Sequence, residues 1–161
     1  MAAPTPPTSQ DVALSAARSF CGWHVTPERE DEAVVFDGPG ARLLALPTLR
    51  LVELTAVSED GVELDLADLE VSARGLVRKR NGGWWSGRFG AIVVTMTHGY
   101  DEADAAGFTA AVASFAERHA AGDKPRVIGP VQWDSVAMAD GSAFTVVERS
   151  LLEKYRLESA P

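Results

Sequence analysis

Residues 91–100 of the chain read AIVVTMTHGY, and the first seven of them are all apolar or β-branched. A short run of this kind favours a buried β-strand. Gly99 follows the run, and a glycine here permits a sharp bend between the strand and the next element. We therefore expect residues 91–97 to form the strongest strand of the fold, around which the other segments can be arranged.

Short runs with a period of two precede this strand, and turn residues separate them. The turn at Asp37-Gly38-Pro39-Gly40 is expected to join its two flanking strands in a hairpin. Turn signals at such short intervals predict a compact antiparallel sheet or small barrel. The expected strands cover residues 33–36, 42–46, 49–57, 62–64, 69–72 and 76–78, with further turns at Glu59-Asp60-Gly61, Arg74-Gly75 and Asn81-Gly82-Gly83.

Segments with helical spacing flank the β region on both sides. Thr8 or Ser9 can cap a first helix, and Gly22 can end it. Thr145 and Glu148 form a capping box that opens the last helix. The fold class is therefore predicted as α+β, a small helical bundle that carries an inserted antiparallel β-sheet or small barrel in a single domain. The expected order is a flexible arm over 1–7, a helix over 8–22, the β insert over 33–98, a helix over 102–121, a strand over 126–133 and a helix over 145–156.

The composition is that of one folded domain with an acidic surface. The 161 residues match the commonest domain size, and 46% of them are apolar, which is enough for a core. A formal charge of −8 argues against a free-standing nucleic-acid binder, because such a protein needs a basic face to displace counterions from phosphates. The same charge is compatible with a protein that surrounds DNA and leaves it mobile.

The cysteine content and the hydropathy of the chain indicate the cellular compartment in which the protein is expected to mature. Cys21 is the only cysteine, so neither an intramolecular disulfide nor a thiolate metal cluster is expected, and a buried inert thiol fits its place on the first helix. The chain contains no apolar run of the roughly 18–20 residues that cross a bilayer, so no membrane partner is expected. The first ten residues, MAAPTPPTSQ, lack the features of a signal peptide. We expect a protein that matures in a reducing cytoplasm.

The residues that carry catalysis or bind metals do not occur here in recognisable patterns. His24, His98 and His119 lack neighbouring ligands at zinc spacing; the first two are expected to hydrogen-bond turns, and the third to lie at the boundary of a helix. The chain has no G-x-S-x-G elbow and no phosphate loop, and the acidic clusters at 28–32 and 101–104 lack the spacing of a calcium loop. No catalytic residue, metal or cofactor is therefore predicted, and a structural role is favoured.

One basic stretch, residues 74–88, interrupts the acidic chain and contains Trp84 and Trp85. Basic residues mixed with aromatics can form a nucleic-acid platform, and they equally suit a contact surface for an acidic protein. Adjacent residues of a strand point to opposite faces, so one tryptophan can enter the core while the other stays exposed. The exposed ring, with Arg78 nearby in sequence, marks a candidate assembly surface.

A series of short landmarks is spread over residues 12–157. They are Phe20-Cys21-Gly22-Trp23-His24-Val25, Asp37-Gly38-Pro39-Gly40, Leu44-Ala45-Leu46-Pro47-Thr48-Leu49, Asp60-Gly61, Thr97-His98-Gly99-Tyr100, Glu148, Leu152 and Tyr155-Arg156. In order and spacing, this series resembles the head-to-tail adaptor (head-completion) proteins of long-tailed double-stranded DNA phages, and most closely the versions found in actinobacterial phages. Each landmark also occupies a position that determines the fold, such as a helix cap or a turn.

The resemblance implies a structural virion protein of the neck, between capsid and tail, that assembles in the cytoplasm of the bacterial host. It implies a homo-oligomeric ring, typically of twelve copies, which lies under the portal protein and extends the channel for the genomic DNA. The ring would dock a stopper or tail-joining protein, and isolated subunits are expected to be monomeric. The C-terminal part would reach toward the portal, which adds Leu151, Leu152, Tyr155, Arg156 and Leu157 to the candidate interface of Arg78, Trp84 and Trp85.

Other interpretations stay open at this point. Leu151, Leu152 and Tyr155 can instead pack the last helix onto its own subunit. A stopper or tail-joining connector is a second structural candidate, although the helices at both ends count against its mainly β-barrel form. A small hydrolase that works through His98 and Asp101, or a DNA-binding regulatory module that uses residues 78–88, has less support.

Overall fold

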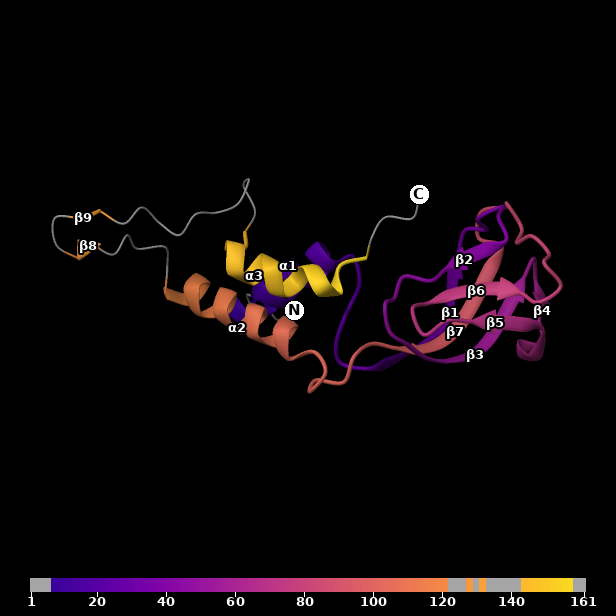
Figure 1. Ribbon diagram of the computed structural model, residues 1–161, viewed down its shortest axis with the longest axis horizontal. Helices are drawn as coiled ribbons and strands as arrows, with labels where there is room; N and C mark the ends of the chain where they lie inside the picture. The colour runs from indigo at the N-terminus through magenta and orange to yellow at the C-terminus, as the bar shows by residue number, and fades with distance from the viewer. Residues whose placement is uncertain (1–6, 122–126, 129–130, 133–142, 158–161) are drawn as a thin grey trace, which may run out of the picture. The chain divides into compact units, whose positions relative to one another are not determined.

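The structure is a computed structural model that describes residues 7–121, 127–128, 131–132 and 143–157, and it confirms the α+β fold (Figure 1). The chain divides into two compact units. A helical unit comprises residues 1–22 and 105–156, and a β unit comprises residues 23–104 with 157–161. In the chain, the β unit is thus inserted between the first and second helices. None of the helices in the described residues is long and apolar enough to span a membrane.

The helical unit contains α1 (Ser9–Cys21), α2 (Ala106–Ala121) and α3 (Val146–Leu152), which the 3-10 turn η3 (Glu153–Tyr155) extends. Thr8 caps α1 in a capping box with Asp11, and Gly22 ends the helix in the left-handed conformation at φ 80°. The expected capping box of Thr145 and Glu148 opens α3. α2 begins four residues later than expected, because residues 102–105 form turns.

Small side chains let these helices pack closely. Ala13, Ala17 and Cys21 recur every four residues on α1 and are fully buried, so one stripe of the helix faces its neighbours. Aromatic rings from the other helices fill the remaining space between them. The buried members contributed by α2 and the C-terminal segment are Phe108, Ala111, Val112, Phe115, Ala116, Phe144, Leu152 and Tyr155.

The β unit consists of two antiparallel sheets and is not a closed barrel. The larger sheet has the order β1 (Arg29–Phe36), β7 (Ile92–His98), β3 (Leu51–Glu59) and β4 (Val62–Glu63). The smaller sheet has the order β2 (Leu43–Ala45), β6 (Leu76–Lys79) and β5 (Leu69–Val71), and the 3-10 turn η1 (Leu66–Asp68) precedes β5. β7, the strand expected to be strongest, lies between β1 and β3 in the larger sheet.

The core of the β unit lies on the inner face of β7. Ile92, Val94 and Met96 alternate along this strand and are almost completely buried. Both sheets and the loop before β7 contribute to the same cluster, which therefore joins the two sheets into one unit. The other buried members are Leu44, Leu46, Leu51, Val57, Leu69, Val77, Trp85 and Ala91.

Two expectations about strand connections are wrong. Residues 37–40 do not close a hairpin, because β1 pairs with β7 in one sheet while β2 pairs with β6 in the other. β1 also begins earlier than expected, at Arg29, because charged side chains are accepted on an edge strand. In place of one strand over 126–133, the described residues there form a short antiparallel pair, β8 (Val127–Ile128) with β9 (Val131–Gln132). The expected arm over residues 1–7 lies outside the described residues except for Pro7.

Candidate functional site

The connection between β6 and β7, residues 80–91, presents the most exposed large aromatic side chains of the β unit. We call it the aromatic loop. The side chain of Phe89 is 91% exposed and that of Trp84 is 62% exposed, whereas the adjacent Trp85 is 2% exposed. Aromatic rings this accessible favour a contact with another molecule, because burying them on binding releases a large apolar area from water.

Trp85 anchors the aromatic loop in the core. Its indole Nε1 donates a hydrogen bond to the carbonyl oxygen of Val77 at 3.3 Å, and its backbone N donates to the carbonyl of Ala41 at 2.8 Å. The expectation of one buried and one exposed tryptophan is confirmed. The reason for it differs, because residues 82–87 form no strand, so backbone anchoring and not strand alternation sets the two directions.

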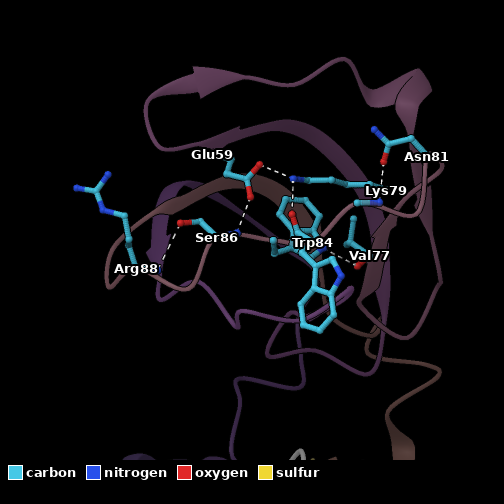
Figure 2. Close-up of polar contacts among 9 residues, drawn as sticks. Glu59, Val77, Lys79, Asn81, Trp84, Ser86 and Arg88 are labelled. Carbon is cyan, nitrogen blue, oxygen red and sulfur yellow. Dashed lines mark hydrogen bonds and ion pairs between the residues drawn. The ribbon is translucent and has the colours of Figure 1, made fainter.

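A pair of largely buried opposite charges holds the loop from within. Lys79 Nζ lies 2.5 Å from Glu59 Oε2, and the side chains of the two residues are only 17% and 14% exposed. Figure 2 shows that Glu59 also accepts a hydrogen bond from the backbone N of Ser86, at 2.7 Å, while Lys79 donates to the carbonyl of Trp84 at 2.9 Å. Lys79 Nζ further lies 4.9 Å from the ring centroid of Trp85. Each buried charge is therefore paired and hydrogen-bonded, which is what makes a buried ion pair tolerable.

Glycines fasten the other end of the aromatic loop to residues 37–40. The backbone N atoms of Gly38 and Gly40 donate to the carbonyls of Arg88 and Ser86 at 2.9 and 3.1 Å. A Cβ atom at Gly38 would lie 2.0 Å from the carbonyl oxygen of Ser86, so only glycine permits this approach. The turn that was expected to form a hairpin thus serves as the support of the aromatic loop.

The charges around the exposed rings are only partly balanced. Arg88 pairs with Asp60 at 3.2 Å, and Arg78 pairs with Glu70 across β6 and β5. Arg42 lies over the ring of Trp84, with 5.9 Å from Cζ to the centroid, and makes no ion pair among the described residues. Sequence reasoning missed both Arg42 and Phe89 as site residues. Arg42 was expected only as the start of a strand, Phe89 lies in no expected element, and only the folded chain brings Arg42 to Trp84.

Buried histidines form a second polar cluster in the β unit. His98 Nε2 lies 2.9 Å from Asp31 Oδ2, and Arg29 contacts the same carboxylate at 2.9 Å. Burial raises the pKa of Asp31, but hydrogen bonds from His98 and Arg29 outweigh it and hold this pKa below its ordinary value. His24 bonds the carbonyl of Pro27, as expected for a turn, whereas His98 bonds a strand carboxylate instead.

His98 and Asp101 are not brought together as an acid–base pair. The carboxylate of Asp101 accepts a hydrogen bond from the backbone N of Ala103 at 2.9 Å, and His98 is 2% exposed beside Asp31. The ring of His119, on α2, stacks on Phe115 and its Nδ1 lies 3.2 Å from Ser9 Oγ. Across the described ranges, no group of three or more His, Cys, Asp or Glu side chains could hold a metal ion.

The C-terminal candidates belong to the helical unit or follow it. Leu152 and Tyr155 are buried, and Leu151 is half-buried. Arg156 is exposed and lies over Phe20, with 5.4 Å from Cζ to the ring centroid. Leu157 is half-buried. An interface role for these residues stays a prediction, and the burial of Leu152 and Tyr155 favours the alternative that they pack α3 and η3 onto their own subunit.

Comparisons with known proteins give a fold relationship. No protein-family model and no curated protein matches the chain. The chain is similar to a chain in the neck of an empty gene transfer agent (GTA) particle computed with C6 symmetry, with a TM-score of 0.62 and 14% identity over 95% of this chain and 78% of that one. It is also similar to a chain in the neck of a native GTA particle computed with C12 symmetry, with a TM-score of 0.59 and 12% identity over 95% and 82%.

At these identities the similarity establishes a shared fold. The arrangement of three helices and antiparallel sheets thus also occurs in the neck of a phage-like particle.

Proposed function

We propose that the protein is a structural, non-enzymatic component of the neck of a phage-like particle, and specifically a head-to-tail adaptor. In this proposal about twelve copies form a ring under the portal protein, extend the channel through which genomic DNA passes, and dock a stopper or tail-joining protein. The subunits are made in the host cytoplasm and end in the virion. The landmark series further suggests a particle of the actinobacteriophage type.

The observation that carries the proposal is the fold similarity over 95% of the chain to two neck chains. A ring of twelve obeys both symmetries named for those necks, since sixfold symmetry is contained in twelvefold symmetry. The charge of −8 agrees with a channel that DNA crosses without being bound, because acidic walls do not retain phosphates. The exposed rings of Trp84 and Phe89 supply a surface for assembly.

Rival functions have less support from the site. A hydrolase centred on His98 lacks the partner it was expected to have, because Asp101 caps a turn. A DNA-binding module would need free cations, and three of those in residues 74–88 are engaged with Glu59, Asp60 and Glu70. A stopper or tail-joining connector stays the structural alternative, and the three helices favour the adaptor over it.

Co-purification with the portal tests the proposal. The purified chain, mixed with the portal ring of the same particle, is expected to co-elute with it in size-exclusion chromatography, while the chain alone elutes as a monomer. A tail-joining protein would instead bind only to portals that already carry an adaptor. Failure to co-elute at any concentration would overturn the adaptor role.

A further inference from the structure

The larger sheet of the β unit has an outer face that carries charge of the opposite sign to the aromatic loop. Along β7, Val93, Thr95 and Thr97 alternate with the buried core residues and are half-buried. Val35 continues the face on β1 and is 60% exposed. The outer face of this sheet is therefore open in the β unit.

Two carboxylates flank the central strand β7 at one end of this outer face. Glu30 on β1 and Glu53 on β3 are both register partners of Thr97, so the three side chains share one row across the sheet. Strand spacing places Glu30 and Glu53 about 10 Å apart. Both are exposed, and neither makes an ion pair within the part of the chain that the structure describes. We call this row the acidic row.

The aromatic loop offers the complementary surface. Trp84 and Phe89 are exposed, and Arg42, which lies over Trp84, has no carboxylate partner among the described residues. The buried pair of Glu59 and Lys79 fixes the loop in place, so little conformational freedom is lost when it binds. Tryptophan and arginine are the residues that most often dominate protein interfaces.

We propose that the aromatic loop of one copy, with Arg42, docks on the acidic row of a second copy. The inference rests on the proposed ring, because a closed ring requires each subunit to present two different and mutually complementary surfaces. The arginine fork of one copy then lies against the carboxylates of the next, and the two exposed rings cover the β-branched side chains of β7. We assign a second copy of this chain as the molecule that docks on the acidic row. The reason is that the two complementary charged surfaces lie on the same chain, at separate places on the β unit.

A charge-exchange series tests the contact. The variants are Arg42→Glu, Glu53→Arg and the double variant, each mixed with the portal ring and scored for subunit rings by negative-stain electron microscopy. Each single variant places like charges at the contact and should lower the number of rings about tenfold, and the double variant should restore most of them. Arg74→Glu and Glu117→Arg are the control variants, since both reverse a charge at an exposed position that belongs neither to the aromatic loop nor to the acidic row, and both should assemble like wild type. Unchanged melting temperatures would verify that all variants fold.

The outcomes separate this contact from the adaptor role. If the single variants assemble like wild type, or the double variant is no better than either, the contact is overturned while the adaptor role stands. If Arg42→Glu fails and Glu53→Arg assembles normally, the loop docks on the portal or another protein and the contact is likewise overturned. If the wild-type chain never forms rings on the portal, the adaptor role fails, and the contact that rests on it fails too.

Discussion

Glu59 and Lys79 form an ion pair at 2.5 Å that connects the end of β3 to the end of β6, under the aromatic loop. The same carboxylate accepts from the backbone N of Ser86, and the same ammonium donates to the carbonyl of Trp84. Two side chains from distant parts of the sequence therefore hold both ends of the segment that exposes Trp84. The ion pair therefore fixes the conformation of the aromatic loop, although this connection is rich in glycine.

Replacing Glu59 by Gln should destabilise the β unit. The substitution leaves Lys79 largely buried without its counter-charge, which should cost about 2–3 kcal/mol of the free energy of unfolding. Urea denaturation, monitored by circular dichroism, measures the change in the free energy of unfolding. Glu63→Gln is the matched control, because Glu63 is exposed on β4, and it should change the free energy by less than about 0.5 kcal/mol. Equal stabilities of the two variants would contradict the role given to the ion pair.

The two adjacent tryptophans should respond in opposite ways to truncation. Trp85→Ala removes a side chain that is 2% exposed and should lower the free energy of unfolding by about 3–5 kcal/mol. Trp84→Ala should change the free energy of unfolding by less than about 0.5 kcal/mol relative to wild type. It should instead reduce assembly on the portal. Chemical denaturation together with ring counting distinguishes the two. If the Trp84→Ala protein assembles normally, the aromatic loop is not part of the interface.

Asp31 should make the stability of the β unit depend on acid pH. Its pKa in the folded state lies below the ordinary value of 3.8, because the hydrogen bonds from His98 and Arg29 outweigh the effect of burial. A carboxyl group with a lowered pKa stabilises the fold above its unfolded pKa, and this contribution is lost as the pH falls through the folded-state pKa. In the Asp31→Asn variant, the free energy of unfolding should therefore fall less steeply than in wild type as the pH is lowered from about 5 to about 2. Urea titrations at several pH values measure the slope, and an unchanged slope would contradict the assignment.

The thiol of Cys21 should be nearly inert in the folded protein. Burial raises the pKa of Cys21 to about 12, with a smaller contribution from the nearby Glu153 carboxylate, so almost no thiolate exists at neutral pH. An aromatic disulfide reagent should react slowly with the Cys21 thiol of the native chain, and rapidly with the same thiol when the chain is unfolded in urea. Ser15→Cys, at an exposed position of the same helix, provides the control and should react rapidly in both conditions. Fast reaction of native Cys21 would mean that α1 opens.

Local chemistry explains what could be predicted from the sequence. The capping box of Thr145 and Glu148 depends on residues three apart, and the end of α1 at Gly22 depends on one glycine, so both helix limits were predictable. The continuous apolar and β-branched run that predicted β7 is local in the same way. The exposed and buried tryptophans could also be anticipated as a pair, although not the reason for their directions.

Long-range pairing explains what could not be predicted. β1 pairs with β7, far along the chain, so the turn signals between them could not reveal that consecutive strands enter different sheets. The contacts that build the candidate site are equally distant in sequence: Arg42 meets Trp84, and Glu59 meets Lys79. No residue pattern near Arg42 signals such a contact.

The most direct test of the central claim is a single-particle reconstruction, without imposed symmetry, of the wild-type chain mixed with the portal ring of its own particle. The account predicts an added ring of about twelve subunits on one face of the portal, with an open channel along the axis. A portal whose two faces stay bare, at concentrations where both proteins are intact and folded, would contradict it.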